Sequence, residues 1–379
     1  MAGPTPRVEI IDSHLRFVAP CDGYMSLSMT LRWSQIGTVD VTVPGDHPRA
    51  GLLTTPGARL RVIAGGRQVF SGPIRTMAGS GPSDASTLTV HAEDDVRLLW
   101  RLLIWPSPSP APSGANGSKM PAEYRRITGP AETVVKTLLR ENIRRAERPI
   151  VIAPDQGRGA TMSASMRFNT IGEKLMGSID NKGLGVTVTQ EDDHLLVDTP
   201  QRRVTERIIS EESGMISQWS WTRAAPTATT IVIGGQGEGK DRLFTQVTNQ
   251  EDVEAWGDVV EEFQDARNND QSTSSLRDDA TETLSGKGSL TGLSVTLSPS
   301  ASMEFGRPES IWPGDMVFAR IAGVDTWEIV REVTVECSDA GDGWASVKPT
   351  FGDYADNPSE LLSRRIRQIA RGVRDLQRV

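Results

Sequence analysis

The chain has 379 residues, 36 Gly, 23 Pro and a formal net charge of −8, with only 5% aromatic residues. This length allows two or three domains with cores of their own, and abundant Gly and Pro are typical of many short strands joined by turns. The acidic balance argues against a nucleic-acid surface, which needs clustered Lys and Arg, and two cysteines, Cys21 and Cys337, cannot form a disulfide framework or a CxxC metal site.

The N-terminal part of the chain alternates apolar and polar residues, as half-buried strands do. Leu27–Leu31 and Val39–Val43 both show this period of two. After Pro56-Gly57, two further alternating runs flank Gly65-Gly66, which predicts a hairpin. Asp94-Asp95 then precede a short apolar helix pattern. We expect one carboxylate to cap this helix, because no second acidic pair or His stands at a spacing that would support acid–base chemistry.

A linker and an α/β segment follow. Residues 105–121, WPSPSPAPSGANGSKMP, have the low complexity of an exposed linker. Beyond it, Gly129-Pro130 opens one amphipathic helix and the capping box Thr170-x-x-Glu173 opens another, which should end at Gly183. The acidic turn Glu191–His194 has the residue types of a metal site, but without a partner ligand a solvated hairpin turn is the better interpretation.

Residues 229–242, TTIVIGGQGEGKDR, nearly form a phosphate-binding loop. Gly234 and Gly239-Lys240 have the spacing of a loop whose backbone N–H groups and Lys hold phosphates. However, Asp241 stands where Ser or Thr must hold magnesium, and the next residues have strand alternation rather than the helix that such a loop needs. We therefore interpret the stretch as a wide loop between two strands, with nucleotide binding through Lys240 as the alternative.

The two β regions resemble each other. Leu27-Ser28-Met29-Thr30-Leu31 matches Leu293-Ser294-Val295-Thr296-Leu297, and Pro56-Gly57 before Ile63-Ala64-Gly65 matches Pro313-Gly314 before Ile321-Ala322-Gly323, one residue further along. Two matches in the same order favour a duplicated β domain over coincidence.

The C-terminal segment, residues 357–379, has apolar residues at alternating steps of four and three. This is the seam of a coiled coil, and Ile at both kinds of seam position favours three strands over two. A terminal helix docked on its own domain is the alternative. The predicted trimer-interface residues are Leu362, Ile366, Ile369, Val373 and Leu376.

Together these patterns predict a mainly β protein with an α+β insertion: two similar β domains, an inserted α/β domain and a C-terminal helix. The predicted segments are a first β domain (1–104, completed by 210–248), the linker (105–121), the inserted domain (122–209), an acidic connector with a short helix (249–286), a second β domain (287–356) and the heptad helix (357–379).

Several of these stretches carry a family resemblance, and the glycine loop is the most specific of them. They are Asp94-Asp95 with Leu99, Arg101, Pro106 and Pro108; Thr128–Glu132; Arg158-Gly159; Arg167-Phe168; Gly183–Gly185; Pro226; and Ile233–Gly239 with Arg242. In these residues the chain resembles the minor tail proteins, or baseplate hubs, of long-tailed siphoviruses, especially those of actinobacterial hosts. Within the loop the characteristic residues are Gly234, Gly235, Gly237, Glu238, Gly239 and Arg242.

The resemblance implies a structural virion protein at the tail tip, assembled in the host cytoplasm. It implies a homotrimer in which each chain carries two tail-tube-like β-barrel domains, so that three chains adapt a six-fold tube to a three-fold tip. The implied partners are the distal tail protein ring, the C-terminus of the tape measure protein and other minor tail proteins. No cofactor, specific nucleic-acid site or membrane segment is expected.

Three other functions compete with this interpretation. Asp241 argues against a nucleotide hydrolase. Against a tip-borne cell-wall hydrolase stand only four His and no HExxH or Cys–His arrangement. A carbohydrate-binding β protein is suggested by nine Trp, but most of them fall in strand patterns that predict core positions.

Overall fold

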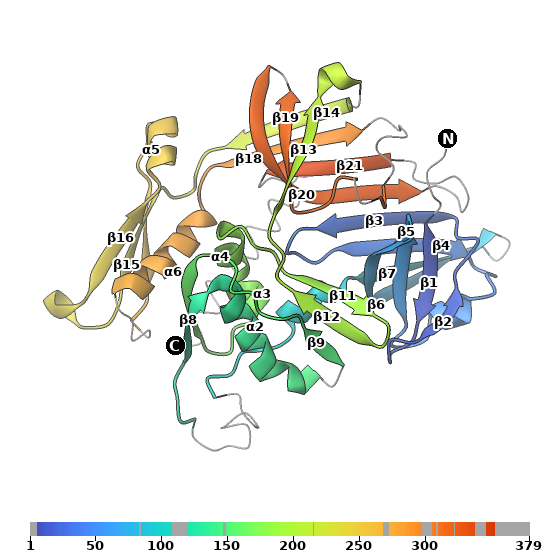
Figure 1. Cartoon of the computed structure of the whole chain (residues 1–379), viewed down its shortest axis with the longest axis horizontal. Helices are drawn as coiled ribbons and strands as arrows, with labels where there is room; N and C mark the ends of the chain where they lie inside the picture. The colour runs from blue at the N-terminus through green and yellow to red at the C-terminus, as the bar shows by residue number, and fades with distance from the viewer. Residues whose placement is uncertain are drawn as a thin grey trace.

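The structure, a computed structural model, describes residues 6–82, 85–107, 120–146, 149–214, 216–267, 273–297, 305–307, 310–321, 323–337 and 346–352. Strands predominate, which confirms the prediction of a mainly β chain (Figure 1). The barrel form of that prediction is not seen: within the described residues every sheet is open, and the largest runs from β14 to β2, with β19 and β13 branching from β20.

The first β unit comes from the N-terminal residues. Its strands follow the order β2-β1-β5-β6-β7-β4-β3. Side chains along β3, β4 and β7 alternate between buried and partly buried positions, as the period of two requires. Its elements are β1 (Arg7–Ile11), β2 (Phe17–Pro20), β3 (Ser26–Arg32), β4 (Thr38–Pro44), α1 (Ala50–Leu53), β5 (Arg59–Ala64), β6 (Arg67–Ser80), β7 (Thr87–Glu93) and the 3-10 helix η2 (Asp95–Trp100).

The second β unit has the order β14-β18-β21-β20-β19-β13. We had expected residues 210–248 to complete the first β domain. Instead β14 pairs with β18, and the strands after it form a separate small sheet. The elements of this unit are β13 (Arg203–Ser210), the 3-10 helix η4 (Glu211–Ser213), β14 (Ile216–Ala224), β18 (Leu290–Leu297), β19 (Asp315–Ile321), β20 (Val324–Cys337) and β21 (Ser346–Gly352).

The two β units meet edge to edge in one continuous sheet. Residues 332–337 of β20 pair antiparallel with residues 27–32 of β3. Across this internal joint Arg32 donates to Glu332 at 2.7 Å, and the hydroxyls of Thr30 and Thr334 lie 3.3 Å apart. Met29 on β3 is fully buried beside β20, and both units contribute side chains to the same core. Figure 1 shows β14, β18, β21, β20 and β3 lying one above the other.

The two units share a strand order. The first runs β1-β5-β6-β7-β4-β3 and the second β13-β19-β20-β21-β18-β14. In each, a 14-residue strand, β6 or β20, pairs with its hairpin partner through its first half. Each of these strands then shifts register, at Ile74 or at Val330, and continues beside β7 or β21. The units differ at one edge, because β1 is antiparallel to β5 whereas β13 is parallel to β19.

The Pro-Gly turns precede corresponding strands, β5 and β19. Gly57 and Gly314, both with positive φ, each stand seven residues before the last paired residue of their strand, Ala64 and Ile321. The hairpin register thus removes the one-residue offset seen in the sequences. The other sequence match is displaced by one strand: β18, which carries Leu293–Leu297, lies in the place of β4 and not of β3.

An α/β segment between β7 and β13 contains a two-stranded sheet, β10-β8, and a three-stranded sheet, β11-β12-β9, packed around the apolar face of α2. The capping box predicted at Thr170 and Glu173 is present. The elements are β8 (Arg125–Pro130), α2 (Ala131–Asn142), the 3-10 helix η3 (Ile143–Ala146), β9 (Ile150–Ile152), β10 (Thr161–Met166), α3 (Ile171–Lys174), α4 (Met176–Asn181), β11 (Thr187–Glu191) and β12 (His194–Asp198).

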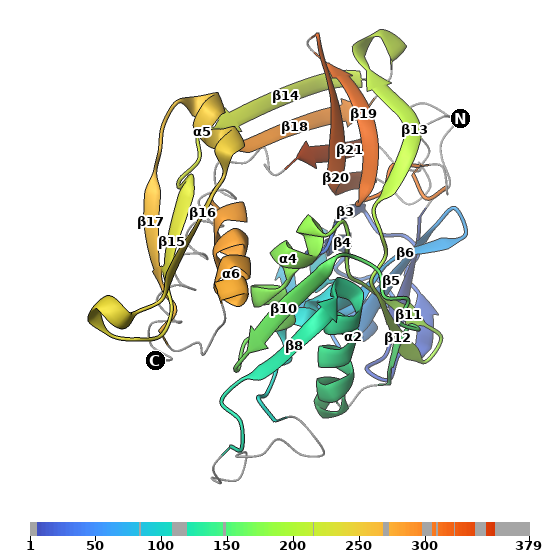
Figure 2. The same ribbon diagram turned by 60° about the vertical axis from the view of Figure 1, so that its left-hand side comes forward.

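A small unit is inserted between β14 and β18. Its sheet has the order β16-β15-β17, and Figure 2 shows α6 lying along it. The predicted acidic connector is part of this unit, because β17 pairs in parallel with β15. Its elements are β15 (Thr230–Gly234), the 3-10 helix η5 (Gly239–Asp241), β16 (Phe244–Thr248), α5 (Gln250–Trp256), β17 (Glu261–Asp265) and α6 (Thr273–Ser285). Among the helices that the structure describes, none is long and apolar enough to span a bilayer.

Candidate functional site

The glycine loop is built around Arg242. Its guanidinium lies over Gly234 and donates to the carbonyl oxygens of Gly234 (2.9 Å) and Gly235 (3.0 Å) and to Asp265 (2.6 Å). A Cβ atom at Gly234 would stand 2.7 Å from Nη2 of Arg242, so only glycine leaves room for the arginine. Arg242 is also 5.2 Å from the ring centre of Phe244, a cation–π distance.

The other glycines of the loop have backbone roles. Gly235 closely approaches α6, since a Cβ there would lie 2.8 Å from a methyl carbon of Leu276. Gly237 and Gly239 have φ of +101° and +55°, the left-handed region that favours glycine. Glu238 occupies the N-cap position of η5 and is exposed.

This geometry contradicts the alternative of a phosphate-binding loop. Such a loop requires a helix whose N-terminal N–H groups face the phosphate. Here the loop contains only the three-residue η5 and then enters β16, which pairs with β15. Lys240 is exposed rather than directed into a cradle. The stretch is therefore the wide hairpin connection that its alternation predicted.

The domain joint centres on Trp33, which sequence reasoning did not single out. Its indole lies between two glycines: a Cβ at Gly185 would meet the ring at 2.4 Å and one at Gly314 at 2.2 Å. The indole N–H donates to Asp180 (3.0 Å), which also accepts from Arg331 (2.6 Å). The inserted α/β segment and both β units therefore meet on one side chain. The sequence showed that Gly314 stands in a Pro-Gly turn. It did not show that Gly314 contacts Trp33.

The Asp94-Asp95 pair is a buried structural feature. Asp94 holds the N-cap position of η2 without a side-chain capping bond, so the expected cap is not formed; its carboxylate accepts from the N–H of Gly37 at 2.8 Å. Asp95 accepts from Arg59 at 2.6 Å and from Ser71 at 2.8 Å. Burial raises the pKa of Asp94 to about 8. The two carboxylates face different partners, so they do not form an acid–base dyad.

A buried ion cluster stabilises the inserted segment. Lys136, with no exposed surface, donates to Glu132 at 2.6 Å and to Asp198 at 2.8 Å. Arg158 donates to the same two carboxylates at 2.8 and 2.9 Å. Hydrogen bonds from Arg158 are the largest cause that lowers the pKa of Glu132. Each charge is paired, as a buried cluster requires.

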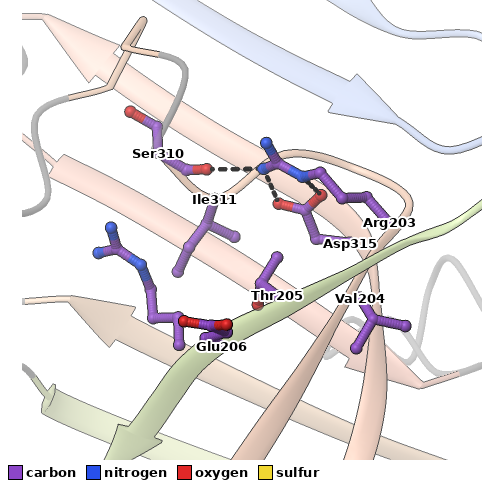
Figure 3. A pocket seen from close by; sticks show the side chains of 8 residues that line it. Arg203, Val204, Thr205, Glu206, Ser310, Ile311 and Asp315 are labelled. Atoms are coloured by element: carbon purple, nitrogen blue, oxygen red, sulfur yellow. Dashed lines mark hydrogen bonds and ion pairs between the residues drawn. The ribbon is translucent and has the colours of Figure 1, made fainter.

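An open cavity of about 440 Å³ lies beside β13, and Figure 3 shows the side chains that line it. Its wall contains Arg203, which donates to both oxygens of Asp315 at 2.8 and 2.7 Å. Thr205 and Glu206 of β13 complete one side, and Ile311 lies across from them. Arg203 and Asp315 are paired with each other, and no nucleophile–base pair is present among the eight lining residues.

The acidic turn of β11 and β12 does not assemble a metal site. His194 lies 3.5 Å from Asp193 and 4.0 Å from Glu191, and both carboxylates are exposed at a hairpin tip. Over the residues that the structure describes, no group of three or more His, Cys, Asp or Glu could hold a metal ion. The predicted trimer-helix residues Leu362, Ile366, Ile369, Val373 and Leu376 lie outside the described residues.

The fold and these sites define a structural β protein whose distinctive features are domain joints and sheet edges. The chain matches the family described as Siphovirus ReqiPepy6 Gp37-like protein over residues 7–353, and it belongs to this family of siphovirus tail proteins. The predicted resemblance to phage tail proteins is thereby confirmed. Membership of this family supports a tail-associated structural role.

Solved structures of tail proteins share the fold. A prophage MuSo2 43 kDa tail protein from Shewanella oneidensis aligns with a TM-score of 0.58 and 10% identity, over 92% of this chain and 97% of that one. A tail protein from Neisseria meningitidis MC58 aligns at 0.56 and 11%, over 92% and 97%. The prophage tail protein gp18 from Listeria monocytogenes EGD-e aligns at 0.53 and 12%, over 95% and 98%. No curated protein matches the sequence.

Proposed function

We propose that this protein is the hub of a siphovirus tail tip, a homotrimer that adapts the six-fold tail tube to a three-fold tip. The observation that carries the proposal is the pair of β units with one strand order, joined edge to edge within a single chain. Three such chains would present six similar units around the tail axis. Symmetric homo-oligomers of this kind are the rule among assembled soluble proteins.

The proposed neighbours follow from this position. The hub would contact the distal tail protein ring on one side, and on the other the C-terminus of the tape measure protein and further tip proteins. We propose no specific nucleic-acid contact, in keeping with the net charge of −8. The protein would assemble in the cytoplasm of its host, for which the motif resemblance favours an actinobacterium, and would remain in the virion.

The proposal also covers how the chain divides into domains. The two β units would be copies of one tube-like domain, with Pro56-Gly57 and Pro313-Gly314 at equivalent turns. Their common spacing from Ala64 and Ile321 supports this equivalence. Residues 357–379 would form a short three-stranded coiled coil on the axis, contributing to trimer stability through Ile366 and Ile369.

Light scattering of the purified full chain over a concentration series tests the proposal. We expect three times the chain mass of 41.2 kDa, with a monomer appearing on dilution. Ile366→Asp with Ile369→Asp should shift the dissociation to higher concentration and leave the β units folded by circular dichroism. A monomer at every concentration would refute the trimer. An unchanged dissociation in the double variant would assign the helix to its own subunit.

A further inference from the structure

The largest sheet has unused pairing edges at corresponding places in the two units. Within the described residues, β14 pairs only with β18. The second half of β6, after its pairing with β5 ends at Pro73, pairs only with β7. Residues 75–80 of β6 are all exposed. Exposed strand edges readily pair with another chain.

These two edges correspond to the two strands that already form the internal joint. In the first unit, Met29 stands in a cross-strand row that ends at Ile74 of β6, where the register shifts. In the second unit, Trp221 stands in the row that ends at Val330 of β20, again at a register shift. Trp221 therefore holds in β14 the position that Met29 holds in β3. Because one row ends at Ile74 and the other at Val330, β6 is the counterpart of β20.

The internal joint also predicts a register. Met29 pairs with Val335, five residues after Val330. The residue five places after Ile74 is Gly79. If the free edges pair as the internal edges do, Trp221 of one subunit lies opposite Gly79 of the next.

Met29 and Trp221 differ in burial, as expected if β14 lacks a neighbouring strand in the single chain. Met29 is 0% exposed because β20 lies beside it, whereas Trp221 is 59% exposed in the single chain. Trp221 lies on the side of the sheet that Met29 occupies, so its indole extends past the edge of the shared core. A large exposed Trp at such a place is typical of the anchor residue of an interface.

The β6 edge has a complementary shape. A hollow of about 460 Å³ opens beside it, lined by Gly79, Gly81 and Leu88, by Ala50 of α1 and by Thr54 just after that helix. This volume greatly exceeds the ~30 Å³ share of one water molecule, so the hollow can accept a side chain. Nothing but a backbone oxygen at 3.9 Å would meet a Cβ at Gly79, so the space in front of this glycine is open.

We infer that copies of this chain join through β14 of one subunit and the second half of β6 of the next, antiparallel, with Trp221 seated in the hollow beside Gly79. This inference rests on the proposed trimer and identifies the surfaces that form it. The contact is heterologous, and such contacts close into a ring when the rotation between copies permits. Each subunit then uses between chains the joint that β3 and β20 make within a chain, and the free edges of β14 and β6 are both paired.

Disulfide cross-linking tests the register. By the same alignment, Ser220 lies opposite Ser80, and directly paired residues of antiparallel strands are within reach of a disulfide. We expect the full chain with Ser80→Cys and Ser220→Cys to form reducible dimers and trimers on oxidation. The matched control, Ser80→Cys with Ser217→Cys, moves one thiol about 10 Å along the strand and should not cross-link. Cys21 and Cys337 are buried and should not interfere.

The mass of each protein separates the possible outcomes. A trimer that cross-links only in the first variant supports the inference. A trimer that fails to cross-link, or that cross-links equally in the control, overturns this interface and leaves the proposed hub intact. A monomer at every concentration overturns both.

A second pair of variants tests the anchor. Trp221→Glu places a charge in the hollow and should weaken association about thirtyfold or more, the loss expected of an interface anchor. Trp327→Glu is the matched control, since Trp327 is 51% exposed but lies on the first half of β20, away from both free edges. Equal association of the two variants would contradict the assignment of Trp221.

Discussion

Substitution of Gly185 by Ala should destabilise the protein through the domain joint at Trp33. The new Cβ would lie 2.4 Å from the indole ring, closer than carbon atoms approach. The ring is held in place, because Gly314 is also in close contact with it and the indole N–H is bonded to Asp180. The backbone N–H of Trp33 is also held by the carbonyl of Arg331 at 2.8 Å. Strain from overpacking costs about 1–3 kcal/mol. Because the Trp33 ring is fixed, we expect Gly185→Ala to lose stability near the upper end of this range.

Thermal unfolding followed by circular dichroism measures this effect. A loss of about 3 kcal/mol corresponds to a lowering of Tm by about 6–12 °C in a protein of a few hundred residues. Gly129→Ala is the matched control, because a Cβ there meets nothing within 4 Å and Gly129 does not need a left-handed backbone. Equal Tm values for the two variants would refute the confinement of Trp33 and the rigidity of the joint.

Three further predictions concern buried groups. Because the pKa of Asp94 is raised from 3.8 to about 8, the folded state retains a proton that the unfolded state loses, so stability should fall by about 1.4 kcal/mol per pH unit between those values. Asp94→Asn should abolish that slope in urea titrations, and parallel pH profiles would contradict it. Lys136→Met should cost about 1.5–3 kcal/mol, the value of a hydrogen bond to a charged group, because the buried Glu132 loses one of its two cationic donors; an unchanged stability would show that Lys136 does not stabilise the cluster. Gly234→Ala should cost about 1–3 kcal/mol because the new Cβ displaces Arg242. In a double-mutant cycle, Gly234→Ala should therefore add little to the loss of stability caused by Arg242→Ala. Fully additive losses would show that Gly234 and Arg242 do not act together.

Much of the fold could be predicted from local pattern. Alternation identified β3, β4 and the hairpins after both Pro-Gly turns, because half-buried strands impose a period of two on the sequence. The capping box at Thr170 and the failure of the phosphate-loop pattern at Asp241 were also local signals, since each depends on a few consecutive residues.

What the sequence did not predict is non-local. The assignment of β14 to the second unit depends on its pairing with Leu290–Leu297, across the whole small inserted unit. Trp33 has the same appearance as any Trp near a strand end, and its importance comes from Gly185 and Gly314, far away in the chain. Trp221 was expected in the core by its strand pattern, and only the strand order reveals that its neighbouring strand is missing within one chain.

The unequal length of two corresponding connections has a consequence for the symmetry of the proposed trimer. Between β3 and β4 the chain turns in residues 33–37, whereas between the corresponding strands β14 and β18 it carries residues 225–289. A gene that duplicated one unit could thus vary one copy while the other kept the plain turn. In a ring built from such chains, bare and decorated units would alternate. The β units of the proposed trimer would then repeat six times around the ring, whereas the small unit would repeat only three times.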